Sequence, residues 1–157
     1  ETGKANQSKL GKPESETKAM KLELTSLENA TASLARSINA AATFEATLPP
    51  ELKETVRSGI IQNFEVAYEL SWKMMKRWLE TNISAESVDG VTRRELFRQA
   101  AENRLLDDVD LWMRFHAARN ETSHTYDNDT AEEVSDSAEQ FVTAAQSLLT
   151  SLRARND

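Results

Sequence analysis

The chain contains no cysteine, three prolines and four glycines among its 157 residues. Without cysteine it can form no disulfide, no thiolate nucleophile and no zinc site with cysteine ligands. Its two histidines, His116 and His124, are too few for a histidine-rich metal site, and we expect no metal and no cofactor. No apolar run approaches the ~20 residues that cross a bilayer. The composition therefore predicts a soluble protein with no membrane partner, and it fits a reducing cytoplasm.

Acidic side chains outnumber basic ones, with 26 Asp and Glu against 19 Lys and Arg and a net charge of −7. The excess is concentrated in residues 120–157, which carry eight acidic and two basic side chains. A protein that coats nucleic acid is basic. If this chain acts on RNA, it must do so at a focused site or through a partner.

Residues 1–19 contain one large aliphatic side chain, Leu10, and no hydrophobic periodicity. They lack the apolar segment of a signal peptide, so we interpret them as a tag-like or disordered leader. Residues 20–157 have the length of one domain.

Apolar residues at steps of three and four predict helices through this domain. Capping-box sequences begin at Thr25, Thr92 and Thr130, and Asp107 or Asp108 is suited to cap a further helix. No alternating strand pattern and no internal repeat is present. The fold class is therefore all-α, an antiparallel bundle of four long helices plus a shorter one. We expect the helices at about 26–43, 50–81 and 92–104, from about 109 onward, and from 130 to about 153.

The helix expected over 50–81 is apolar over a wide arc, which is typical of a central helix or of one that faces both a core and a partner. Gly59 inside it costs roughly 1 kcal/mol relative to alanine. It either permits the close approach of another helix or is a tolerated surface glycine. Trp72, Trp78 and Trp112 occupy core positions, which favours packing over base stacking.

Residues 119–126 form the one credible reactive constellation. Arg119 is suited to bind a phosphate through two hydrogen bonds, and His124 can transfer protons near pH 7. Together they would suffice for metal-free RNA cleavage: a base takes the ribose 2′-OH proton, arginine stabilises the phosphorane, and an acid protonates the leaving 5′-oxygen. The structural alternative is that both residues merely cap carbonyls or favour the dipole at a helix end.

The spacing of this pair makes two demands on the structure. Five residues correspond to about 140° around an ideal helix, so the helix must end or distort between Arg119 and His124. The turn-like residues 127–129 permit this. In addition, each chain offers one proton-transfer group where two are ideal, and a two-fold dimer would supply the second copy.

Two further groups of residues have structural and functional interpretations. His116 shares an apolar stripe with Trp112, and we expect it to be a packed or capping histidine. Four arginines, at 93, 94, 98 and 104, would line a phosphate path or lie on a solvated helix face, and the second interpretation is favoured.

The pattern Arg119, His124, Tyr126 resembles the signature of HEPN-domain toxins of the HEPN–MNT toxin–antitoxin systems, also described as nucleotidyltransferase substrate-binding proteins. The resemblance covers roughly residues 20–152. It extends to Leu22-Glu23-Leu24, Leu27-Glu28-Asn29-Ala30, Phe64-Glu65, Trp72-Lys73, Arg94-Glu95 and Leu106-Asp107-Asp108.

This resemblance implies a HEPN-like bundle that acts as a homodimer and as a metal-independent endoribonuclease. It implies that Arg119 and His124 are catalytic and that Asn120 supports them. It also implies a partner, a minimal nucleotidyltransferase antitoxin that transfers AMP to Tyr126. The alternative is a non-catalytic helical subunit that binds a nucleotidyltransferase and presents its substrate, with the same fold.

Overall fold

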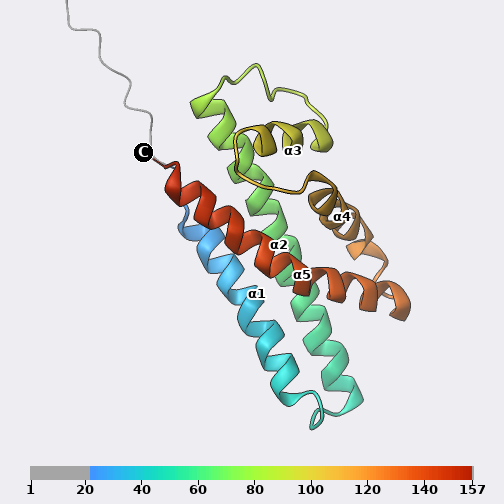
Figure 1. Ribbon diagram of the computed structural model, residues 1–157. Helices are drawn as coiled ribbons and strands as arrows, with labels where there is room; N and C mark the ends of the chain where they lie inside the picture. The colour runs from blue at the N-terminus through green and yellow to red at the C-terminus, as the bar shows by residue number, and fades with distance from the viewer. Residues whose placement is uncertain (1–21, 157) are drawn as a thin grey trace, which may run out of the picture.

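The computed structural model of the protein describes residues 22–156, and the leader expected over 1–19 lies outside this range. Within the described range the regular elements are helical, which confirms the all-α class with five α-helices (Figure 1). The sequence predicted four long helices and one shorter one, whereas two of the five have only 10 and 12 residues. The elements are α1 (Thr25–Phe44), α2 (Pro50–Asn82), α3 (Arg93–Glu102), α4 (Val109–Asn120), the 3₁₀ turn η1 (Glu121–His124) and α5 (Asn128–Ala154).

The three long helices form the body of the molecule. α1 and α2 are antiparallel, α5 packs across both, and α3 and α4 lie against the other side of α2 (Figure 1). The two ends of the described chain meet, because the Asn156 side chain accepts from the Leu22 N–H at 2.8 Å and donates to the Leu22 carbonyl at 3.0 Å. Among residues 22–156, no helix combines the length and the hydropathy needed to cross a membrane.

Phe141 of α5 lies at the centre of an aromatic cluster that joins three helices. Its ring meets Phe64 of α2 at 5.3 Å and 80°, and meets Trp112 and Phe115 of α4 at 5.5 and 5.1 Å with similar edge-to-face angles. Such geometry adds about 0.5–1.5 kcal/mol per pair to the burial of the rings. These contacts fix α4 against α2 and α5, and so determine where the C-terminal end of α4 lies.

The buried part of α2 is shorter than its apolar pattern. Burial begins at Ile60, whereas Leu52 is 50% exposed. Trp78 and Trp112 are buried as predicted, and Trp72 is half-buried. A Cβ at Gly59 would meet no atom of residues 22–156 within 4 Å, so no helix of the described chain approaches it closely and Gly59 is a surface glycine of this chain.

Two of the four predicted helix caps are observed. Thr92 accepts from the Glu95 N–H at 3.2 Å and Asp108 accepts from the Leu111 N–H at 3.0 Å. At α1 the predicted cap is wrong, because the Thr25 hydroxyl donates to the Glu23 carboxylate instead.

The start of α5 also differs from the prediction. Asp127 caps this helix by accepting from the Thr130 N–H at 3.1 Å and from the Thr130 hydroxyl at 2.8 Å. Thr130 therefore lies in the first turn instead of capping it. The same two hydrogen bonds hold the pKa of Asp127 below its usual range.

Candidate functional site

α4 ends at Asn120, directly after Arg119, and the chain continues as a tight 3₁₀ turn to His124. Hydroxyl groups satisfy the carbonyls that this change of helix type leaves open. Thr122 donates to the Arg119 carbonyl at 2.8 Å and Thr125 donates to the Thr122 carbonyl at 3.2 Å. Such local bonds compete with the regular helical pattern. The prediction that the helix must distort between Arg119 and His124 is confirmed.

The Arg119 side chain lies against two carboxylates of α2. Its Nε is 3.3 Å from Glu69 Oε1 and its Nη1 is 3.8 Å from Glu65 Oε2. Nη1 also donates to the Thr122 hydroxyl at 3.0 Å. The side chain is 32% exposed, but Nε itself is shielded from solvent and faces Glu69 without the alignment of a hydrogen bond. Arg119 is thus a partly buried cation whose outer edge reaches the surface.

Glu69 links Arg119 to the stacked side chains of Trp72 and Arg93. Its other oxygen, Oε2, accepts from the Trp72 indole N–H at 3.1 Å. The guanidinium carbon of Arg93 lies 3.4 Å from the centre of the Trp72 ring, a cation–π contact. Burial lowers the pKa of Arg93, opposed by the charge of Glu69 among others. The carboxylate of Glu69 is therefore held on both of its oxygens.

The neighbouring arginines of α3 are engaged elsewhere. Arg94 pairs with Asp110 at 3.2 Å, and Arg98 pairs with Glu95 and Glu102 of its own helix. These pairs are exposed and belong to a solvated helix face, as the sequence favoured. For Arg93 that expectation is wrong, because its side chain is partly buried against Trp72.

His116 is a packed histidine, as expected from its apolar stripe. Its Nδ1 and the Tyr68 hydroxyl are 2.8 Å apart and share a hydrogen bond. Burial, followed by the charge of Arg93, lowers the pKa of His116, and burial raises the pKa of Tyr68. Both groups are therefore neutral near pH 7. His116 lies one helical turn before Arg119 and adds no charge beside it.

The other residues of the predicted site lie on the surface beyond the end of α4. Asn120, His124 and Tyr126 are exposed, and Tyr126 is 88% exposed. The rings of His124 and Tyr126 have centres 6.2 Å apart at an angle of 76°. The structure thus brings His124 and Tyr126 close to each other, while Arg119 is fixed separately against α2.

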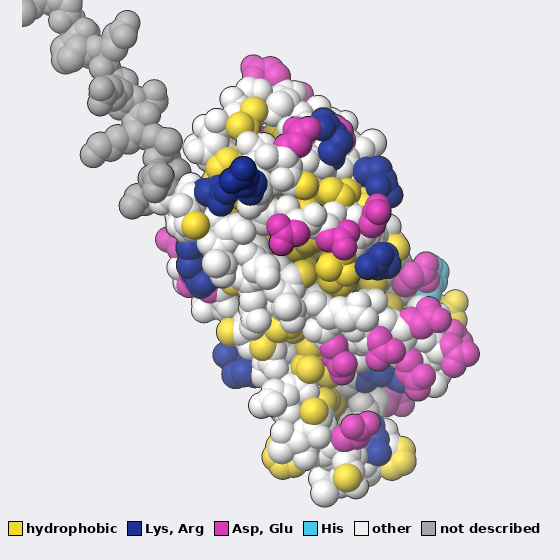
Figure 2. All heavy atoms as spheres, viewed as in Figure 1, with side chains coloured by type: hydrophobic (Ala, Val, Ile, Leu, Met, Phe, Trp, Pro, Cys, Tyr) yellow, Lys and Arg dark blue, Asp and Glu magenta, His cyan; other side chains and the backbone are white. Residues whose placement is uncertain are grey.

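A groove of about 600 Å³ opens beside Tyr126, between the far end of the α1–α2 hairpin and the start of α5. Ile38, Val56 and Ile60 supply apolar lining, and the α5 wall is acidic, which agrees with the acidic side chains gathered over the start of α5 in Figure 2. The α5 wall repels a phosphate backbone, whereas the α2 side of the groove also carries Lys53 and Arg57. The acidic lining residues of α5 are Glu132, Asp136 and Glu139.

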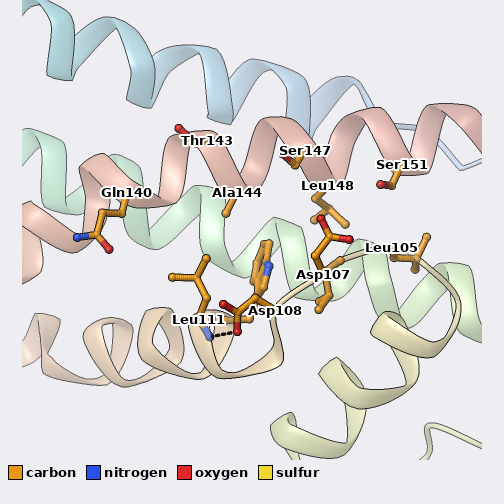
Figure 3. A pocket seen from close by; sticks show the side chains of 12 residues that line it. Leu105, Asp107, Asp108, Leu111, Gln140, Thr143, Ala144, Ser147, Leu148 and Ser151 are labelled. Atoms are coloured by element: carbon orange, nitrogen blue, oxygen red, sulfur yellow. Dashed lines mark hydrogen bonds between the residues drawn. The ribbon is translucent and has the colours of Figure 1, made fainter.

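A second cavity, of about 230 Å³, lies between α5 and the segment that enters α4 (Figure 3). Its Asp108 is occupied as a helix cap, and no residue of 119–126 lines it. It is separate from the candidate site. Across residues 22–156 no three His, Asp or Glu side chains are grouped so that they would hold a metal ion.

Sequence reasoning missed Glu65 and Glu69 as partners of Arg119. The signal was present as two carboxylates one helical turn apart on α2, among residues that are otherwise mostly apolar. Their pairing with α4 follows from tertiary packing, which the sequence pattern did not give.

The protein is thus a helical bundle whose fourth helix ends inside the segment 119–126. The chain belongs to the family described as "Nucleotidyltransferase substrate binding protein like", whose sequence profile matches residues 22–154.

Individual relatives support this membership. A Haemophilus influenzae protein named "Probable ribonuclease HepT" is 37% identical over 109 residues, which is 69% of this chain and 75% of the relative. A solved structure, also from Haemophilus influenzae, is described as revealing the fold of a substrate-binding domain of a nucleotidyltransferase. It is 32% identical, has a TM-score of 0.80, and the match covers 83% of this chain and 99% of that one. A Thermus thermophilus structure has 26% identity and a TM-score of 0.63, covering 81% of this chain and 98% of that one.

Proposed function

We propose that this protein is the toxin of a toxin–antitoxin pair and a metal-independent endoribonuclease of the cytoplasm, with Arg119 and His124 as its catalytic residues. The main support is the break after α4, which fixes Arg119 against α2 and exposes His124 five residues later. The similarity to a protein named as a probable ribonuclease supports the same activity.

The reaction needs a proton acceptor, a proton donor and a cation. A neutral His124 imidazole takes the proton of a ribose 2′-OH, and the 2′-oxygen attacks the adjacent phosphorus. Arg119 stabilises the charge that develops on the phosphate oxygens. The bond to the 5′-oxygen breaks as that oxygen receives a proton from the protonated imidazole of a second histidine, which leaves a 2′,3′-cyclic phosphate and a 5′-hydroxyl. The exposed amide of Asn120, next to Arg119, is suited to hydrogen-bond the same phosphate or ribose.

The removal of either catalytic group tests this assignment. Arg119→Ala and His124→Ala should each lower the cleavage rate of a labelled RNA by at least ~10²-fold, the usual scale for a proton-transfer or electrostatic group. Both variants should keep the far-ultraviolet circular dichroism of the wild type, since neither residue belongs to the hydrophobic core. Arg114→Ala, which removes an exposed arginine of the same helix, is the matched control. Full activity in both site variants would refute the proposal.

We assign a homodimer to the active form. Each described chain exposes one histidine at the site, while the acid and the base of the reaction are best supplied by two. Apolar side chains at the α1–α2 hairpin and on α2 are also unusually exposed, with Phe44 at 56%, Leu52 at 50% and Val66 at 48%. A two-fold contact through this part of the molecule would cover them and pair two sites.

Light scattering of an active preparation at micromolar concentration should give the mass of two chains. The proposed contact is made by exposed apolar side chains and not by Arg119, so the mass should be unchanged by Arg119→Ala. A monomer alone in a preparation that cleaves RNA at full rate would contradict the two-chain site.

Tyr126 is assigned as the regulatory site, the acceptor of AMP from a partner nucleotidyltransferase. In the proposed reaction histidine carries out the proton transfers and Arg119 stabilises the charge, so the Tyr126 hydroxyl is not needed for cleavage. Its exposure of 88% puts it within reach of another enzyme. A nucleotide there would add charge and bulk close to His124, whose ring centre is 6.2 Å away.

Tyr126→Phe separates regulation from catalysis, because it removes one oxygen and keeps the ring. The variant should cleave RNA within ~2-fold of the wild type, as expected for a surface substitution. After co-expression with the nucleotidyltransferase, mass spectrometry should find adenylyl groups on the wild type and none on the variant. A variant that is still modified, or as inactive as His124→Ala, would overturn the assignment.

A second candidate function is a non-catalytic subunit that presents substrate to a nucleotidyltransferase. It is favoured by the description of the Haemophilus influenzae structure as a substrate-binding domain. This function predicts that nucleotide transfer by the partner depends on the chain, while RNA remains intact in its presence. The cleavage assay on Arg119→Ala and His124→Ala distinguishes the two functions.

A further inference from the structure

The two α2 carboxylates beside Arg119 oppose the task proposed for that residue. Glu65 and Glu69 lie 3.8 and 3.3 Å from its guanidinium. Negative charges at this distance weaken the attraction of arginine for a phosphate. If Arg119 binds phosphate as proposed, these carboxylates must contribute something else that offsets the weaker attraction.

Glu69 is the better placed of the two to control the orientation of Arg119. It contacts Nε, the atom that fixes the rotation of the guanidinium plane. It does not swing freely, since its second oxygen accepts from the Trp72 indole at 3.1 Å and Trp72 is covered by Arg93. On the opposite edge, Nη1 donates to Thr122 at 3.0 Å.

This arrangement leaves the hydrogens of Nη2 without a hydrogen-bond acceptor in the described part of the chain. Among residues 22–156, Arg119 Nη2 donates no hydrogen bond, and the shortest ion-pair contacts of the guanidinium are made by Nε and Nη1. An unrestrained arginine loses side-chain conformational entropy when it is fixed on a ligand. A guanidinium that is hydrogen-bonded at Nη1 and ion-paired at Nε meets part of this cost before substrate arrives.

We propose that Glu69 is the positioning residue of the site: it holds the Nε edge of Arg119 so that Nη2 faces the scissile phosphate. The inference rests on the proposed ribonuclease function. Glu69 touches no reacting atom in this scheme and acts through Arg119. Glu65, which is farther from the guanidinium, has a smaller part in the same task.

The positioning role and a simple charge effect predict opposite changes in cleavage activity for Glu69→Gln. If Glu69 acted by its charge alone, Glu69→Gln would strengthen phosphate binding and raise activity. If Glu69 positions Arg119, the same substitution leaves RNA binding equal or stronger but lowers the turnover rate, because a shielded Nε–H loses its counter-ion and the guanidinium loses its alignment.

The test is steady-state cleavage of a short RNA by Glu69→Gln. We expect kcat to fall ~10-fold, within the range seen for misplaced catalytic groups, while KM is unchanged or lower. Glu65→Gln should lower kcat less. The matched control is Glu80→Gln, which removes a carboxylate of the same helix that pairs with Lys76 at 3.9 Å. Both of its kinetic parameters should stay within ~2-fold of the wild type, as expected for an exposed pair.

Repeating the Glu69→Gln substitution in an Arg119→Lys variant separates a positioning role from a loss of structure. Arg119→Lys keeps the positive charge but has no guanidinium plane to orient. Glu69→Gln added to Arg119→Lys should therefore lower kcat by less than ~2-fold further, a non-additive result. An equal ~10-fold loss in both backgrounds, or a loss that parallels a fall in thermal stability, would show that Glu69 serves the fold and would overturn the inference.

The orientation of Arg119 also has a readout that does not depend on cleavage. In the free wild-type protein, Nε–Hε of Arg119 should give a resolved nitrogen-15 NMR signal with slow solvent exchange, and Glu69→Gln should broaden it or remove its protection. If Arg119→Ala abolishes cleavage while Glu69→Gln changes neither kcat nor this signal, the positioning role is wrong and the ribonuclease stands. If the wild type cleaves no RNA, the ribonuclease and the role built on it both fail.

Discussion

The packing of α4 against α2 and α5 around Phe141 is the constraint on which the rest of the site depends. Edge-to-face contacts at 5.1–5.5 Å bind Phe141 to Trp112 and Phe115 of α4, and a similar contact binds it to Phe64 of α2. With α4 fixed in this way, its last turn brings Arg119 against the carboxylates of α2. The residues after the break are then free of the core, which exposes His124 and Tyr126.

The distribution of charge around this site restricts how much RNA the proposed site would contact. The groove beside Tyr126 has an acidic wall on α5, and the neighbouring arginines Arg94 and Arg98 are already paired with carboxylates. Binding energy from phosphate contacts grows with the number of phosphates neutralised. A site that depends on one arginine per chain would therefore bind RNA weakly as a single chain and gain from a second copy across a two-fold axis. The acidic surface is better suited to a protein partner that approaches Tyr126.

The sequence predicted the helical class and most helix positions, because hydrophobic periodicity and scarce glycine and proline report local structure directly. It also predicted the break between Arg119 and His124, since two residues five positions apart cannot lie on one face of a helix. It assigned two helix caps wrongly, because another polar group lies close by in the sequence. Asp127, not Thr130, caps α5, and the Thr25 hydroxyl donates to Glu23 instead of capping α1. It did not find Glu69, because the contact of Glu69 with Arg119 joins residues fifty positions apart and depends on how α4 packs against α2.

The central claim is that residues of this chain cleave RNA by attack of the ribose 2′-OH, with a histidine and an arginine in place of a metal. The most direct measurement is the chemistry of the product ends after incubation of a defined RNA with the purified chain in excess EDTA. The mechanism predicts cleavage at the rate seen without chelator, with a 2′,3′-cyclic phosphate on one product and a 5′-hydroxyl on the other. Cleavage that requires added magnesium, or products with a 5′-phosphate, would contradict it.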